Sequence, residues 1–422
     1  MLKGINLKSQ FLKYIIVLMS GTMIAQLINL GLSVILYQNF YNPEEAAELG
    51  LFARIIGVGA AIATARYELA MPIAKADVHS FRLYRLALRI ALIASGITSI
   101  VVLIPLFLAG NVSDALFYGM IPFGMFLTAY YNIGTNWAIR TRAFRSISFS
   151  KVANVGVGGG LKLLLGWLGS GYIGLIIGTV GGLVVANGWF ARTFQKANLT
   201  FNVKAKSPRT KVLAKTYSEF PRVNLPHSMM DVGRDLIVAI LILQLFEKAD
   251  YGAFDHSYRM LRMPLMLAGL AISQVFFQRC SEKFNNGEDI FPMVFKAVKV
   301  LALISIVPFG LIFLLGDDLF AWVFSEKWRA AGEYSQIMAP WFMLNFIASP
   351  ISFLPLILGK QKQFFFIASG GAVSMILGFW IPDTFFQASI ETTLWIVSLA
   401  QVAYYLFVIF KTFQYLKQVT PK

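Results

Sequence analysis

The chain has 422 residues, of which 57% are hydrophobic and only 14% are charged. Soluble proteins are typically about 45–50% apolar and about 25% charged, so both fractions depart in the same direction. A mean hydropathy of +0.66 would require almost every side chain to be buried, which no soluble domain of this size achieves. The composition therefore predicts an all-α integral membrane protein with many spans. It excludes a soluble enzyme, a secreted disulfide scaffold and a disordered chain.

The formal charge of +16 comes from 37 Lys and Arg against 21 Asp and Glu. The basic residues form short clusters between apolar runs, as positive-inside sorting produces, so nucleic acid is not predicted as a partner. The single Cys280 excludes a disulfide framework and a thiolate metal cage. The sequence has no phosphate-binding G-x-x-x-x-G-K-[ST] motif, and its three histidines lack metal-ligand spacing. We therefore expect no cofactor, no metal and no enzymatic activity.

The apolar runs are taken as helical spans, because lipid offers backbone groups no hydrogen-bond partner and a span needs roughly 20 residues. The first run follows Lys3, Lys8 and Lys13 and is too long for a cleavable signal, so it is interpreted as a retained span. About twelve transmembrane helices are predicted, at residues 11–38, 48–74, 82–109, 115–139, 149–169, 172–194, 219–246, 252–278, 291–316, 334–358, 364–382 and 390–415.

The charges of the connections predict the orientation. An even number of spans places both termini on one side, and the side richer in Lys and Arg is cytoplasmic. One set of connections contains Lys248, Lys327 and Arg329 as its only basic residues, and it also carries acidic residues such as Asp317, Asp318 and Glu326. The other set is strongly basic and includes Lys75, Arg140, Arg142, Arg145, Lys196, Lys204, Lys206, Arg209, Lys211, Lys215, Arg279, Lys283, Lys360 and Lys362. Both termini are therefore expected in the cytoplasm.

The longest hydrophilic connection follows the sixth span and predicts two six-helix lobes. The N-terminal lobe is expected at residues 1–194, a basic cytoplasmic linker at 195–218 and the C-terminal lobe at 219–422. Each lobe begins and ends inside, so an axis relating them would run along the membrane normal. Within the first lobe, the pairs Gly156–Gly160 and Gly178–Gly182 have the small-xxx-small spacing of close helix contacts.

Charged residues within the predicted spans are candidates for function. Each of two spans carries a set of charges on one helix face, because residues three and four apart are neighbours. The seventh span contains Asp231, Arg234 and Asp235, and the eighth contains Asp255, Arg259 and Arg262.

The remaining charges lie in the second span and at the start of the seventh. Arg54 lies in the outer part of the second span, and Arg66 with Glu68 lies in its inner part. Arg222 lies near the cytoplasmic mouth of the seventh.

Two interpretations of the deep arginines remain open. If the four deep arginines faced lipid, their insertion would cost about 10–14 kcal/mol, at about 2.5–3.5 kcal/mol each. These four are Arg54, Arg234, Arg259 and Arg262. They therefore face a water-filled cavity, or they pair with acidic neighbours, as Asp231–Arg234 and Asp255–Arg259 would within their own helices. The cavity interpretation implies an anionic substrate, because the planar fork of Arg suits phosphate oxygens.

Four segments, in order from about residue 50 to 360, resemble the oligosaccharide-lipid flippases of the polysaccharide transporter family. That family belongs to the multidrug/oligosaccharidyl-lipid/polysaccharide exporter superfamily. The segments are Ala65-Arg-Tyr-Glu-Leu-Ala-Met-Pro72 with the following Ile-Ala-Lys-Ala-Asp77, Phe220-Pro-Arg-Val-Asn-Leu-Pro226, Tyr258-Arg-Met-Leu-Arg-Met-Pro264 with Ile272-Ser-Gln-Val-Phe276, and Trp328-Arg-Ala-Ala-Gly-Glu-Tyr334 with Ala339-Pro-Trp341 and Ser349-Pro350.

The resemblance implies the fold of multidrug-and-toxin-extrusion transporters, with two six-helix lobes around a central cationic cavity and alternating access. It implies a flippase in the bacterial inner membrane that moves undecaprenyl-pyrophosphate-linked oligosaccharide for O-antigen, capsule or exopolysaccharide synthesis. Membrane lipid, a polysaccharide polymerase and a chain-length protein are its implied partners. The substrate-binding candidates are Arg54, Arg66, Arg222, Arg234, Arg259 and Arg262, and the ion-coupling candidates are Glu68, Asp231, Asp235 and Asp255.

Two other functions are considered. An ion-coupled drug or metabolite antiporter of the same superfamily would favour an acidic or aromatic cavity for cationic drugs, whereas the predicted cavity here is net basic. A membrane polymerase or glycosyltransferase would need a large outer loop or a cytoplasmic nucleotide-sugar domain, and the predicted connections contain neither.

Overall fold

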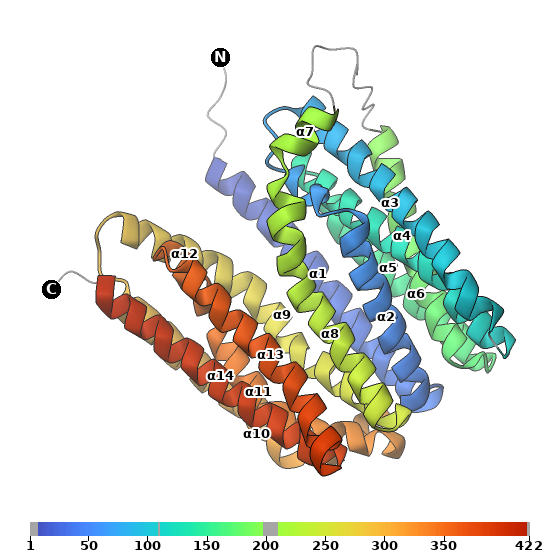
Figure 1. The fold of residues 1–422 in the computed structure, drawn as a ribbon. Helices are drawn as coiled ribbons and strands as arrows, with labels where there is room; N and C mark the ends of the chain where they lie inside the picture. The colour runs from blue at the N-terminus through green and yellow to red at the C-terminus, as the bar shows by residue number, and fades with distance from the viewer. Residues whose placement is uncertain (1–6, 109, 197–209, 420–422) are drawn as a thin grey trace. The chain divides into compact units, whose positions relative to one another are not determined.

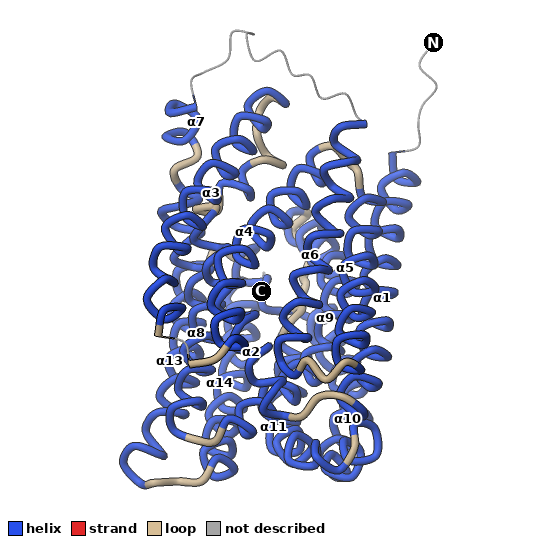
Figure 2. Tube along the Cα trace, turned by 90° about the vertical axis from the view of Figure 1, so that its right-hand side faces the viewer, coloured by secondary structure: helices blue, strands red, loops and turns tan. Residues whose placement is uncertain are grey.

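The computed structural model describes the backbone of residues 7–108, 110–196 and 210–419. The part of the chain that it describes is almost entirely helical and contains no strand (Figure 2). This confirms the predicted all-α class. Most of the predicted linker, 197–209, lies outside the described residues.

The long helices follow the predicted spans in order (Figure 1). Eight helices in the described part are long and apolar enough to cross a membrane: α1, α2, α3, α4, α6, α10, α13 and α14. The other long helices, α5, α8, α9 and α11, do not meet this criterion of length and apolar composition. In α8 the reason is that Asp231, Arg234 and Asp235 lie close together within the helix. The long helices are α1 (Leu7–Asn39), α2 (Pro43–Ala63), α3 (Asp77–Phe107), α4 (Val112–Arg140), α5 (Phe144–Trp167), α6 (Gly171–Lys196), α8 (Leu225–Leu245), α9 (Lys248–Asn285), α10 (Phe291–Phe324), α11 (Arg329–Ala348), α13 (Gln361–Phe386) and α14 (Ile390–Val419).

Short helical turns join several of these helices. They are η1 (Tyr67–Ala70), α7 (Thr210–Thr216), the π-helical turn η2 (Phe220–Asn224), η3 (Glu326–Trp328), η4 (Ile351–Phe353) and α12 (Leu354–Ile357).

Several predicted boundaries are wrong, among them the end of the tenth span, which was expected at 358, whereas α11 ends at Ala348. The second span was expected to run from 48 to 74, but α2 ends at Ala63 because Ala65 and Arg66 adopt positive φ angles of 47° and 59°. The connection expected at 317–333 is mostly helical, since α10 continues to Phe324 and α11 begins at Arg329.

The described chain forms two compact units. Unit 1 comprises residues 1–41 and 48–236, and unit 2 comprises 42–47 and 237–422. Two helices therefore contribute residues to both units, α2 on either side of 47/48 and α8 on either side of 236/237. The lobe boundaries at 194 and 219 remain a prediction.

In unit 1, α5 packs against both α1 and α6, and α4 packs against α3 and α6. The glycines explain how closely α5 and α6 approach. A Cβ added to Gly158 would lie 2.9 Å from the carbonyl oxygen of Gly178, and one added to Gly182 would lie 2.5 Å from that of Asn154. The predicted glycine pair on α6 is therefore confirmed. The pair on α5 is wrong, because Gly156 and Gly160 face open space and the contact face of α5 is formed by Gly158.

In unit 2, α11 is the central helix, because it packs against α9, α10 and α14. Tyr334, Trp341 and Phe342 on this helix are all buried, which accounts for its position inside the unit. By contrast, α10 is very apolar but presents Leu303, 70% exposed, outward. An exposed apolar face of this kind is expected where a helix meets lipid tails.

Candidate functional site

The structure divides the predicted substrate-binding arginines between the two units. Arg54, Arg66, Arg222 and Arg234 belong to unit 1, and Arg259 and Arg262 belong to unit 2. Each group is described within its own unit.

Arg66 lies in a left-handed turn after α2. Its backbone has φ 59° and ψ 12°, and the preceding Ala65 also has a positive φ of 47°. A residue with a Cβ in this conformation costs about 1–2 kcal/mol, so surrounding contacts must hold the turn. Its guanidinium supplies such contacts: Nε donates to Ser228 Oγ at 2.8 Å, and Nη1 donates to Glu68 Oε1 at 3.4 Å.

Glu68 is buried beside Arg66, with 1% of its side chain exposed. One carboxylate oxygen takes the contact from Arg66, and the other, Oε2, has no hydrogen-bond partner within the described residues. Glu68 lies beyond the end of α2, and burial raises the pKa of its carboxyl while the Thr64 hydroxyl and Arg66 act in the opposite direction. A buried carboxyl of this kind is suited to binding a proton.

Arg222 lies in η2, which packs against η1 in unit 1. It is exposed, and it forms no ion pair in the part of the chain that the structure describes. Its charge acts on Tyr67, where it lowers the pKa of a phenol that burial raises. The Tyr67 hydroxyl donates to the carbonyl oxygen of Ala214 at 3.1 Å. Two segments that carry the family resemblance therefore meet, around Arg66 and around Arg222.

The ion pair on α8 differs from the Asp231–Arg234 pair that the second interpretation predicted. Arg234 forms its ion pair with the adjacent Asp235, with Nη2 to Oδ1 at 2.8 Å. Asp231 is exposed and takes part in no ion pair among the described residues. Arg54 on α2 is half-buried and donates from Nη1 to the carbonyl oxygen of Gly50 at 3.4 Å.

In unit 2, the predicted pair of Asp255 with Arg259 is present. Asp255 is fully buried on α9 and pairs with the guanidinium of Arg259, whose side chain is 38% exposed. Arg262, one turn further along, is exposed and lies with Cζ 5.1 Å from the centroid of the Tyr258 ring. Two guanidinium groups therefore lie on the exposed face of α9, above a buried carboxylate and an aromatic ring.

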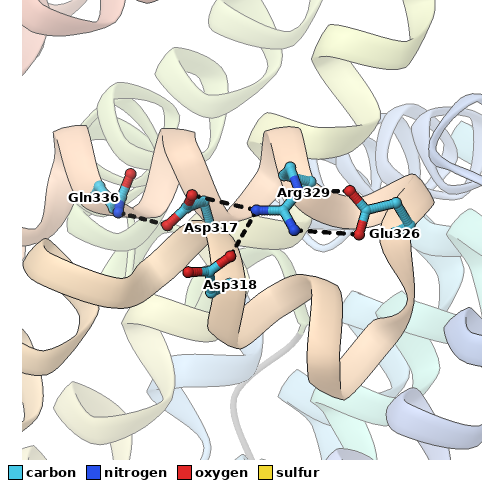
Figure 3. A network of polar contacts seen from close by, with 5 residues as sticks. All are labelled: Asp317, Asp318, Glu326, Arg329 and Gln336. Carbon is cyan, nitrogen blue, oxygen red and sulfur yellow. Dashed lines mark hydrogen bonds and ion pairs between the residues drawn. The ribbon is translucent and has the colours of Figure 1, made fainter.

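A second charged cluster lies where α10, η3 and α11 meet (Figure 3). Arg329 donates to Asp318 Oδ1 at 2.8 Å, to Asp317 Oδ2 at 3.3 Å and to Glu326 Oε1 at 2.5 Å. Gln336 donates to the other oxygen of Asp317 at 2.9 Å. The acidic residues predicted for this connection therefore surround one arginine. Within the described chain, no group of three His, Cys, Asp or Glu residues is arranged to bind a metal ion.

Sequence reasoning missed Ser228 and Arg140. Arg140 was interpreted only as a cytoplasmic charge, but it donates to the backbone oxygens of Pro72 and Ala74 and pairs with Asp77. Ser228 lies two residues after the Phe220–Pro226 segment, and this position is the only sequence signal that could have indicated it.

Comparison with solved structures defines the class of fold. An inward-facing multidrug resistance MATE family transporter of the MOP superfamily matches with a TM-score of 0.70 at 16% identity, over 96% of this chain and 98% of that one. The lipid II flippase MurJ in an inward closed conformation matches with a TM-score of 0.68 at 14% identity, over 96% and 90% of the two chains.

A MOP superfamily transporter from Pyrococcus furiosus matches with a TM-score of 0.61 at 15% identity, over 97% of this chain and 96% of that one. The binding pocket of that transporter has reverse polarity, which suggests a different function for it. The chain thus has the all-α membrane fold of MATE and MOP superfamily transporters. At these identities the likeness defines the fold alone.

Comparison of the sequence then defines the family. The family described as "Polysaccharide biosynthesis protein" matches residues 115–333, which is just over half of the chain. The protein belongs to this polysaccharide biosynthesis family and is a multi-pass membrane protein with the MATE-like fold, which confirms the family resemblance. No curated protein matches the sequence.

Proposed function

We propose that the protein is a flippase that moves a lipid-linked oligosaccharide from the cytoplasmic to the outer leaflet of the bacterial inner membrane. The substrate is an oligosaccharide repeat on undecaprenyl pyrophosphate, destined for O-antigen, capsule or exopolysaccharide. The observation that carries the proposal is the packing of η1, which directly follows Arg66, against η2, which contains Arg222, in a member of a polysaccharide biosynthesis family. Both termini lie in the cytoplasm in this proposal.

The arginines act as donors to the diphosphate, because a guanidinium can bind two phosphate oxygens at once. Arg66 and Arg222 receive the headgroup first. Arg54, Arg234, Arg259 and Arg262 are the further proposed donors. The glycan passes through a polar interior while the isoprenoid chain stays in lipid, and the two lobes are proposed at 1–194 and 219–422. Membrane lipid, a polymerase and a chain-length protein are the proposed partners.

Alternating access in this proposal is coupled to an ion. Of the four acidic candidates, Asp235 and Asp255 are paired with arginines and Asp231 is exposed. Glu68 also contacts Arg66, at 3.4 Å through Oε1, but it is buried and its other oxygen, Oε2, has no hydrogen-bond partner among the described residues. These observations favour Glu68 as the group that takes up a proton.

The proposal is tested with purified protein in liposomes that contain a fluorescent undecaprenyl-diphosphate oligosaccharide. Leaflet accessibility is measured with an added glycosidase. We expect protein-dependent exposure of the glycan, which Arg66→Ala and Arg222→Ala abolish and which the matched change Arg145→Ala, at an exposed arginine outside the proposed set, leaves intact. Absence of movement by the folded wild-type protein would refute the flippase. Movement of cationic drugs in its place would favour the antiporter.

A further inference from the structure

Two turns far apart in the sequence converge in unit 1. The turn at η1 and the π-helical turn η2 pack against each other, and the Arg66 side chain reaches from the first to the helix that follows the second. Arg66 and Ser228, which the hydrogen bond joins, are separated by 162 positions in the chain.

Ser228 is oriented before Arg66 reaches it. Its hydroxyl donates to the carbonyl oxygen of Asn224, in η2, at 2.8 Å. Because the hydroxyl proton is used in that bond, the Ser228 oxygen is left as an acceptor, and Arg66 Nε donates to it at 2.8 Å. The π-helical turn thus determines the direction of the bond that holds Arg66.

The guanidinium of Arg66 is only partly used. Ser228 takes the Nε–H and Glu68 takes one Nη1–H, while the two hydrogens of Nη2 have no partner among the described residues. Ala65 and Arg66 have left-handed backbones, and the Arg66 side chain reaches Ser228 on α8. A guanidinium held at Nε and Nη1 presents the hydrogens of Nη2 in a fixed orientation.

The surrounding charge favours an anion. Arg222 lies close enough to act on Tyr67, the residue after Arg66, and has no ion pair within the described chain. Glu68 is the acidic group beside Arg66, and it lies buried. Asp77 of α3 and Arg140 of α4 form an ion pair with each other at 2.8 Å.

We propose that the Arg66 turn and η2 form one oxyanion site for the diphosphate of the lipid carrier, in which Arg66 and Arg222 are the donors and Ser228 is a positioning residue. This inference rests on the proposed function, and it deepens it by assigning the first phosphate contact to two specific turns. Without the Ser228 acceptor, the Arg66 guanidinium can turn toward Glu68. Its N–H groups then no longer point at the phosphate oxygens.

The test measures binding of inorganic pyrophosphate to the purified full-length protein by calorimetry, and half-saturation and maximal rate of glycolipid movement in liposomes. Ser228→Ala is expected to weaken pyrophosphate binding and to raise the half-saturating concentration by about tenfold, as expected for a lost hydrogen bond to a charged group. The maximal rate should change little. Ser228→Thr, which keeps the hydroxyl, should restore both values.

Ser99→Ala is the matched control, because Ser99 makes the same hydroxyl bond to a carbonyl four residues earlier but holds no arginine. It should leave pyrophosphate binding unchanged. Wild-type binding by Ser228→Ala, together with loss of binding by Arg66→Ala, would refute the role of Ser228. Wild-type binding by both Arg66→Ala and Arg222→Ala would refute the site. Arginine-dependent pyrophosphate binding without any glycolipid movement would support the site and refute the proposed function.

Discussion

Arg140 donates a 2.7 Å hydrogen bond from Nη1 to the backbone oxygen of Ala74. The same nitrogen donates to the oxygen of Pro72 at 3.1 Å, and Nε donates to Asp77 at 2.9 Å. One side chain at the end of α4 therefore fixes the connection between η1 and α3. This connection follows the turn that carries Arg66, so the orientation of the site depends on a residue outside it.

The first prediction concerns this contact. Arg140→Ala should lower the free energy of unfolding by about 1.5–3 kcal/mol, because it removes charge-assisted bonds to backbone oxygens that have few other donors. Arg140→Lys should restore only part of the loss, since a single ammonium cannot reproduce the planar fork. The melting temperature in detergent measures the effect. Equal stability of the Lys variant and the wild type would contradict the geometric argument.

The second prediction separates structure from substrate binding at Arg259. Its removal alone leaves the buried carboxylate of Asp255 without its ion-pair partner, and breaking a buried pair typically costs about 3–5 kcal/mol. Arg259→Ala should therefore reduce the folded yield. The double variant Asp255→Asn with Arg259→Gln should recover folding because no buried charge remains.

Glycolipid movement by that double variant decides the role of Arg259. A folded but inactive protein is the expected result if the guanidinium binds the diphosphate. Full activity would show that the pair only stabilises unit 2.

The third prediction concerns the close approach of α10 and α11. A Cβ added to Gly332 would lie 2.3 Å from the carbonyl oxygen of Gly316, so Gly332→Ala must push the helices apart. Overpacking of this kind costs about 1–3 kcal/mol, and the melting temperature should fall. Gly310→Ala in α10 is the control, because its Cβ would enter open space. A similar fall in both variants would instead indicate a general effect of glycine replacement.

The fourth prediction is a pH dependence at the cluster of Figure 3. Hydrogen bonding from Arg329 holds the pKa of Glu326 below its usual range. A depressed carboxyl pKa stabilises the folded state above the unfolded pKa, and this contribution is lost as the pH falls through the folded pKa. The melting temperature should therefore fall further between pH 6 and pH 3 for the wild-type protein than for the Arg329→Gln variant. Parallel curves for the two proteins would contradict the pairing.

Much of the fold was predictable because it depends on local composition. The helices α1, α4, α13 and α14 follow their apolar runs closely, since only a helix satisfies the backbone in lipid. The wrong prediction that the second span continues through Ala65 and Arg66 has a different cause. Neither residue type favours a positive φ, and the turn is held by the Arg66 bond to Ser228, which the local sequence does not contain.

The candidate site was predictable in kind but not in arrangement. Charged side chains inside apolar runs are costly, so Arg234, Asp255 and Arg259 could be identified as special from position alone. The Asp255–Arg259 pair follows from helical spacing, because its members are one turn apart. The pairing of Arg234 with Asp235 does not, since rotamers within one helix decide between several neighbours.

The sequence by itself determined that this protein crosses the membrane many times, where most spans lie and which residues place charge among them. Those properties follow from hydrophobic length and from the cost of charge in lipid, and both act along a single segment. Only the tertiary structure decided that Arg66 binds Ser228, that Arg140 holds Ala74 and that Gly158, not Gly156 or Gly160, contacts α6. These contacts join side chains and backbone from different helices, and such meetings depend on how the helices pack.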